Sequence, residues 1–115
     1  VKDSNVLILG FTFKENCPDV RNTKIVDIYH TLEEYTKNIT VYDPWANADK
    51  VEHEYGVQLT SSSLESLKGK FNAVILAVAH KEFVSLDIRS FLKNENGVVY
   101  DVKGILDREM IDGRL

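Results

Sequence analysis

The stretch Asn5-Val6-Leu7-Ile8-Leu9-Gly10 decides the fold that we expect for this chain. Four consecutive apolar residues closed by a glycine predict a short strand buried on both faces, as in a parallel sheet. Between residues 22 and 36, apolar positions recur at helical spacing with charged residues between them, which predicts an amphipathic helix of about four turns. Residues 38–43 are rich in β-branched side chains and end before Pro44, which predicts a second strand.

The rest of the chain continues this alternation of strands and helices. In order, we expect a helix at residues 48–55, a strand at 56–59, a brief helix after 62, a strand at 71–78, a helix at 82–92 broken near 85–87, a strand at 97–101 and a helix at 106–111. The brief helix is predicted from Ser62 and Glu65, which have the spacing of a capping box. The alternation predicts a three-layer, Rossmann-like α/β domain: a mostly parallel sheet of about five strands with helices on both faces.

Length and composition limit the classes of function. The chain has 115 residues, and we expect residues 1–115 to form one domain with its own core. A net charge of −4 argues against nucleic-acid binding, which needs a concentrated basic surface. The longest apolar run, residues 71–79, is interrupted by Asn72 and is too short to cross a bilayer, and no signal peptide is evident. We therefore expect a cytoplasmic protein without a nucleic-acid or membrane partner.

The reactive side chains point to no catalytic or metal centre. Cys17 is the single cysteine, so it forms no intrachain disulfide, which fits a reducing compartment. No base is evident near it in sequence, and we interpret Cys17 as incidental rather than as a nucleophile. His30, His53 and His80 lack metal-like spacing, and we expect the first two to lie on the surface.

The start of the chain suggests a larger protein. Val1 stands where a methionine is usual, and a core strand begins four residues later. We expect this chain to be cut from a longer protein, part of whose function lies outside these residues.

The ligand site is expected beyond the carboxyl ends of the strands, where open parallel sheets bind their ligands. The loop after the first strand has about ten residues, whereas such turns usually have about two to six. It carries Lys14 and Arg21 beside a helix N-terminus, which favours anions. The alternative is that Lys14 pairs with Glu15 and Arg21 with Asp19, leaving a charge-neutral loop.

A dinucleotide fingerprint is absent from this loop. Gly10 is followed by Phe11, Thr12 and Phe13, not by the glycines that let a pyrophosphate approach the backbone. Asp43 ends the second strand, where a Rossmann domain holds a ribose. Without the glycines, we interpret Asp43-Pro44 as the start of a turn.

Two further residues belong to the same end of the predicted sheet. His80 follows the strongest strand, where it is either a residue that faces the ligand or a helix-capping or loop-packing residue, and both interpretations stay open. Lys103 follows the fifth strand and should converge with Lys14, which favours an anionic ligand.

Four motifs follow one another along the chain. The first is Gly10-Phe11-Thr12-Phe13-Lys14 with Asp19 and Arg21-Asn22-Thr23; the others are Val41-Tyr42-Asp43-Pro44, Ala77-Val78-Ala79-His80 with Phe83, and Tyr100-Asp101-Val102-Lys103. Together, over essentially the whole chain, these motifs resemble the C-terminal domain of the UDP-glucose/GDP-mannose dehydrogenase family. The segment Asn16-Cys17-Pro18-Asp19 and the pair Ala79-His80 resemble the branch that acts on UDP-N-acetylhexosamines more than the UDP-glucose branch.

The resemblance implies one part of an NAD-dependent nucleotide-sugar 6-dehydrogenase, which oxidises the C6 alcohol of a UDP-sugar to a carboxylate for surface-polysaccharide synthesis. It implies that NAD is bound mainly by a separate N-terminal domain and that the full-length protein is a homodimer. The family's catalytic cysteine belongs to a Gly-rich motif that this chain lacks, so the chain alone should be inactive.

The resemblance also implies the contacts of individual residues. Phe13 and Lys14 would contact the nucleotide sugar, and Arg21 would reach NAD across the cleft. Lys103 stands where relatives often carry an arginine that contacts the UDP moiety, and lysine lacks the bidentate fork of arginine. The resemblance assigns no catalytic role to His80.

Two other functions remain open from the residues. One is a stand-alone dinucleotide-binding or regulatory module, favoured by the Rossmann-like alternation and Asp43. The other is a receiver-like interaction domain, which would need an acidic cluster that is missing after the first strand. The sequence does not identify the sugar.

Overall fold

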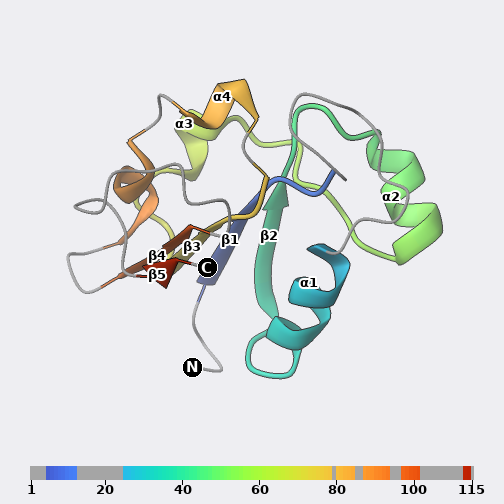
Figure 1. Ribbon diagram of the computed structural model, residues 1–115, viewed down its shortest axis with the longest axis horizontal. Helices are drawn as coiled ribbons and strands as arrows, with labels where there is room; N and C mark the ends of the chain where they lie inside the picture. The colour runs from blue at the N-terminus through green and yellow to red at the C-terminus, as the bar shows by residue number, and fades with distance from the viewer. Residues whose placement is uncertain are drawn as a thin grey trace.

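A parallel five-stranded sheet forms the middle of the molecule (Figure 1). The computed structural model describes residues 5–12, 25–78, 80–84, 87–93, 97–101 and 113–114. The strands are β1 (Asn5–Leu9), β2 (Asn38–Tyr42), β3 (Ala73–Leu76), β4 (Val98–Asp101) and β5 (Gly113–Arg114), in the order β2-β1-β3-β4-β5. The chain runs outward from β1 to β2 and then returns to the other side of β1, so the strand order reverses between β1 and β3.

Helices cover both faces of this sheet, as Figure 1 shows. They are α1 (Ile25–Glu33), α2 (Ala48–Tyr55), α3 (Leu64–Leu67) and α4 (Lys81–Val84), followed by a 3₁₀ helix, η1 (Ile88–Phe91). Among the residues that the structure describes, none of the helices has the length and apolar character needed to cross a membrane.

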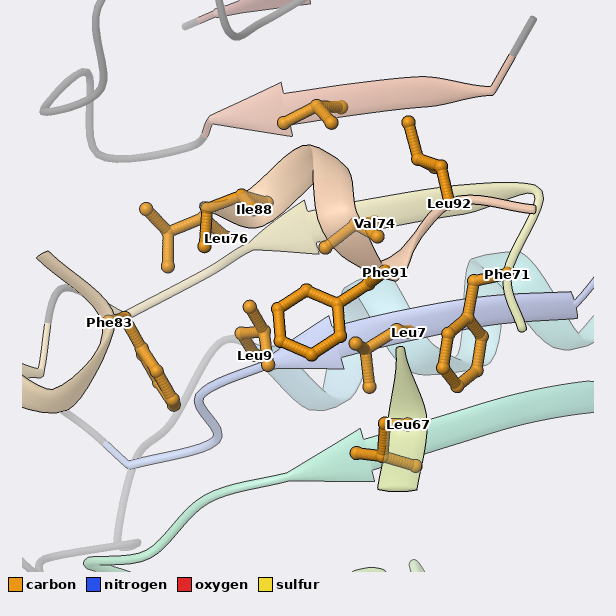
Figure 2. Packing of buried hydrophobic residues seen from close by; sticks show 11 residues of the cluster. Leu7, Leu9, Leu67, Phe71, Val74, Leu76, Phe83, Ile88, Phe91 and Leu92 are labelled. Carbon is orange, nitrogen blue, oxygen red and sulfur yellow. The ribbon is translucent and has the colours of Figure 1, made fainter. Parts of the chain in front are cut away.

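The alternating side chains of β1 divide the core into two clusters. Leu7 and Leu9 point to one face, where they pack with residues of α3, α4 and η1 (Figure 2). Ile8 points to the other face and joins the cluster formed with α1 and α2, represented by Ile25 and Val51. Because successive strand residues face opposite sides, one five-residue strand supplies both clusters. The predicted three-layer α/β architecture with a parallel sheet is confirmed.

The set of strands differs from the prediction at two places. Residues 56–59 do not form a strand: Leu59 makes only an isolated bridge to Val41, and Gly56 is the left-handed C-cap of α2. Val57 is fully buried in the core, so its apolar character reflects packing rather than strand pairing. The fifth strand is instead β5, which pairs with β4 and was not predicted.

The helices also correct several boundaries. The first helix ends at Glu33 rather than near residue 36, and a turn leads into β2. Ser63, not Ser62, is the N-cap of α3, and its hydroxyl accepts a hydrogen bond from the Ser66 N–H, so the predicted capping box with Glu65 is wrong. The predicted break in the helix at 82–92 is confirmed, because α4 and η1 are separate and Asp87 precedes η1. The helix expected at 106–111 lies outside the described residues.

Candidate functional site

Three loops meet at one carboxylate beyond the carboxyl ends of the strands. The Oδ2 atom of Asp43, directly after β2, accepts hydrogen bonds from the N–H groups of Phe11 and Thr12, at N···O distances of 2.6 and 3.0 Å. Phe11 and Thr12 belong to the loop after β1. His80, which follows β3, places its Nε2 atom 2.9 Å from the same Oδ2 atom. Asp43 thereby joins the loops after β1, β2 and β3.

The second oxygen of Asp43 organises its own loop. Oδ1 accepts hydrogen bonds from the backbone N–H groups of Trp45 and Ala46, at 2.8 and 3.1 Å. This is the side-chain turn that Asp commonly forms with the residues that follow it. The interpretation of Asp43-Pro44 as a turn start is confirmed. Because both oxygens already accept hydrogen bonds from the protein, the geometry does not favour Asp43 as a ribose ligand.

His80 is a fully buried side chain. Its Nε2 atom also lies 3.0 Å from the hydroxyl oxygen of Thr12. A carboxylate only accepts hydrogen bonds, so we assign a proton to Nε2, which then donates to Asp43. The imidazole stacks on Trp45, with ring centroids 5.9 Å apart and 25° between the planes, and Phe83 contacts it at a centroid distance of 5.6 Å.

Trp45 extends this contact network outward. Its indole N–H donates to Oε1 of Glu82 at 2.8 Å, and the ammonium of Lys81 lies 5.4 Å from the centroid of its ring. Both partners lie at the start of α4, so Trp45 links the loop after β2 to this helix. The network therefore runs from the buried Asp43 and His80 to the partly exposed indole.

The environment of Asp43 favours its ionised form. Burial raises the pKa of the carboxyl, but the hydrogen bonds from His80, Phe11 and Trp45, together with the charge of His80, outweigh burial and lower the pKa below its ordinary value of 3.8. An ionised carboxylate accepts stronger hydrogen bonds than a neutral acid, so the loops meet at a fixed negative charge.

Gly10 makes the close approach of two of these loops achievable. Its φ is +103°, a conformation that L side chains rarely adopt. A Cβ atom at this position would lie 2.6 Å from the Cβ and 2.8 Å from the backbone nitrogen of Val78. Gly10, which directly follows β1, therefore allows the backbone to pack closely against Val78 where the strand order reverses. We interpret this packing, rather than contact with a pyrophosphate, as the reason for the glycine.

The structure describes only part of the predicted site. Phe13, Lys14, Arg21 and Lys103 lie outside the described residues, as does Cys17, so their assignments remain predictions. His80 lies at the expected end of the sheet, but its side chain is buried. Its backbone oxygen accepts a hydrogen bond from the Phe83 N–H at the start of α4, which agrees with the capping and packing interpretation.

The remaining histidines agree with the sequence analysis. His30 on α1 and His53 on α2 are exposed. His30 pairs with Glu33 one turn later on the same helix, at 2.9 Å. Within the described ranges, no group of histidine, cysteine or carboxylate side chains is arranged to hold a metal ion.

Sequence reasoning missed the pairing of Asp43 with His80 and the part played by Thr12. One signal was available: each of these polar residues follows an apolar strand, and β2, β1 and β3 are neighbours in the sheet. Parallel strands bring such residues to one edge. The distance between two particular side chains depends on loop conformation, which spacing along the chain does not determine.

Comparison with known proteins identifies relatives of this chain over its whole length. The model of the UDP-glucose/GDP-mannose dehydrogenase family, UDP binding domain, matches residues 7–108. UDP-N-acetyl-D-glucosamine 6-dehydrogenase of Salmonella typhi is 45% identical over 118 aligned residues, which cover 100% of this chain and 27% of the relative. Protein CapL of Staphylococcus aureus is 37% identical, over 97% of this chain and 26% of the relative. The chain thus spans about a quarter of the length of these relatives.

Solved structures share the same fold at lower sequence identity. UDP-D-ManNAc dehydrogenase from Pyrococcus horikoshii superposes with a TM-score of 0.75 at 20% identity, over 98% of this chain and 25% of that one. NDP-N-acetyl-D-galactosaminuronic acid dehydrogenase from Methanosarcina mazei gives a TM-score of 0.76 at 18% identity, over 96% of this chain and 24% of that one. At these identities the likeness supports the fold alone.

Proposed function

This chain belongs to the UDP-glucose/GDP-mannose dehydrogenase family as a UDP-binding domain, and we propose that it holds the nucleotide sugar in an NAD-dependent UDP-N-acetylhexosamine 6-dehydrogenase. One observation carries the proposal: the 45% identity to a UDP-N-acetyl-D-glucosamine 6-dehydrogenase extends over 100% of the chain. The whole enzyme would oxidise the C6 alcohol of its substrate to a carboxylate, in the cytoplasm and as a homodimer, to supply a surface polysaccharide such as a capsule.

In the proposed site, the loop after β1 supplies the main contacts to the UDP-sugar. Phe13 would pack against the ligand, and Lys14 would place a mobile positive charge beside it. Lys103 would contact the UDP moiety through a single ammonium rather than a guanidinium fork. Support comes from Thr12, the residue directly before Phe13, whose N–H is fixed on Asp43 where the strand order reverses. Ligands of open parallel sheets bind at this reversal.

The described residues do not fit an NAD site of their own. Both oxygens of Asp43 accept hydrogen bonds from protein groups, and the fully buried Phe11 follows Gly10 directly, where a dinucleotide fold needs open backbone. NAD, which accepts the hydride in such oxidations, would therefore be held mainly by another domain, with Arg21 reaching it from this one. The catalytic cysteine would also lie outside this chain, so we expect the 115-residue chain to be inactive alone.

Binding and activity of the complete enzyme test the proposal. Calorimetric titration with UDP should give saturable binding, and NADH absorbance should rise with a UDP-N-acetylhexosamine faster than with UDP-glucose. Lys14→Ala and Lys103→Ala should each raise the KM for the UDP-sugar about tenfold or more, the loss expected for one charge-assisted contact. Arg21→Ala should instead raise the KM for NAD.

Lys37→Ala is the matched control. Lys37 is exposed and immediately precedes β2, so its removal deletes the same charge at the opposite end of the sheet. The control should leave both KM values near those of the wild type. Absence of UDP binding to the wild-type enzyme would refute the function. Wild-type affinity in both lysine variants would refute only the residue assignment.

A further inference from the structure

The side chains of Asp43 and His80 are fully buried, yet they lie at the end of the sheet where the ligand is proposed to bind. Both side chains have an exposed fraction of 0%. Direct contact with a nucleotide sugar would need one of them to reach the surface, so any part that they play in binding must pass through other residues. The groups that they hold are the backbone N–H groups of Phe11 and Thr12 and the hydroxyl of Thr12.

We infer that Asp43 and His80 are positioning residues for the UDP-sugar site, which fix the backbone of Phe11 and Thr12 directly before Phe13 and Lys14 in the chain. The inference rests on the proposed function. It adds two residues that act on the ligand only through the loop after β1.

The connectivity of the carboxylate supports this role. The hydrogen bonds of Oδ2 join residues 32, 31 and 37 positions away from Asp43, so the contacts are not a local turn. Three donors converge on this one oxygen, which leaves little freedom for the backbone at Phe11 and Thr12. A change at His80 removes one of the three donors and the contact to the Thr12 hydroxyl together.

The energetics also distinguish positioning from simple packing. Burying a carboxylate beside an imidazole is costly, and well-packed apolar residues of similar volume often give equal or greater stability. A fully satisfied polar network instead selects one arrangement of the groups that it joins. Among the described residues, every buried side-chain nitrogen and oxygen has a hydrogen-bond partner. The network is therefore complete enough to specify the backbone geometry of Phe11 and Thr12.

The test compares three variants of the complete enzyme. His80→Leu removes the donor and keeps an apolar side chain in the buried space. His80→Gln keeps an N–H donor near the position of Nε2. Phe91→Leu is the matched control, because Phe91 on η1 is also fully buried but packs in the core cluster that contains Leu7 and Leu9. Thermal unfolding of each variant measures the loss of stability, and steady-state kinetics with the UDP-N-acetylhexosamine measure KM and kcat.

We expect His80→Leu to raise the KM for the UDP-sugar about tenfold or more, as for the loss of one hydrogen bond to a charged group. The kcat at saturating substrate should stay within about twofold, because loss of binding shared by ground and transition states changes KM alone.

His80→Gln should restore most of the affinity. Phe91→Leu should lower the melting temperature without changing KM. Backbone amide exchange in the peptide that contains Phe11 and Thr12 should be faster in His80→Leu than in His80→Gln.

Other results would overturn either the inference or the proposed function. Equal KM values in His80→Leu and the wild type would overturn the inference, as would equal increases in His80→Leu and His80→Gln. If His80→Leu does not fold, Asp43→Asn serves instead and should raise KM in the same way; an unchanged KM there would overturn the inference. Failure of the wild-type enzyme to bind UDP would refute the proposed function itself, which separates the two failures.

Discussion

Asp43 shows how one side chain can define the geometry of a sheet edge. Its two oxygens accept three and two hydrogen bonds, and four of these five come from backbone N–H groups. Backbone donors cannot move away as a flexible side chain can, so the carboxylate fixes the course of the chain at Phe11, Thr12 and Trp45. In Asp43→Asn the side chain would keep its shape, but one oxygen would become an NH₂ group. That group is itself a hydrogen-bond donor and would face the N–H groups that now donate to the carboxylate.

The acid dependence of stability follows from the pKa of Asp43. The folded-state pKa lies below the ordinary value of 3.8, so the contribution of the ionised carboxylate is fully present well above pH 3.8 and is lost as the pH falls through the folded-state value. Asp43→Asn should cost about 3 kcal/mol at neutral pH, as expected for breaking a buried pair. Urea unfolding of both proteins across pH should show this difference shrinking below pH 3.8. If the difference in the free energy of unfolding stayed constant down to the lowest pH, the lowered pKa of Asp43 would be contradicted.

At this scale, the sequence predicts residue types at the site better than it predicts their contacts. The position of His80 after a strand was sufficient to place it at the ligand end of the sheet. Its burial was not predictable, because it depends on Trp45, Phe83 and Thr12, which come from three different segments. Phe13, Lys14, Arg21 and Lys103 remain predictions.

At the scale of single elements, capping determines where the short helices begin. Asn47 caps α2 and Ser63 caps α3, each by accepting a hydrogen bond from the N–H three residues later. A helix of four residues such as α3 gains little from its own hydrogen bonds, so its cap and the burial of Leu67 are important for its stability.

A pair of serine variants tests the position of this cap. Ser63→Ala should destabilise the protein by about 1 kcal/mol, because the Ser66 N–H loses its acceptor. Ser62→Ala is the control, since Ser62 is exposed and lies one residue before the cap, and it should change the free energy of unfolding by less than about 0.5 kcal/mol. Denaturant unfolding measures both. A larger effect at Ser62 would restore the capping box predicted from the sequence.

The elements also show why some boundaries were predictable and others were not. Residues 48–55 form a helix over the predicted range, because Asn47 and Gly56 provide a cap at each end. Residues 56–59 have the composition of a strand, but only Leu59 reaches a neighbouring strand. Apolar composition predicts that a residue is buried. It does not predict which element covers the side chain, because that depends on the fold.

For the whole molecule, the sheet architecture was predictable because it depends on the coarsest pattern in the sequence. The apolar run of β1 needs cover on both faces, and Leu7, Leu9 and Ile8 divide it between the two clusters. The alternation of strands with helices then predicts that the strands pair in parallel. The two-residue strand β5 was not predictable, since it is too short to show a pattern.

The long sequence separations of the Asp43 contacts have a consequence for the order in which the protein assembles. The carboxylate can gather its donors only after β2, β1 and β3 have come together, so this edge should form late on the folding pathway. Asp43→Asn should therefore accelerate unfolding about a hundredfold and leave the refolding rate nearly unchanged, as for an interaction absent from the transition state. Stopped-flow folding and unfolding in urea measure both rates. A slowed refolding limb would instead place Asp43 in the nucleus. If the edge does form last, the proposed ligand end is also the first part of the molecule to open, and a bound nucleotide there would slow the loss of the native state.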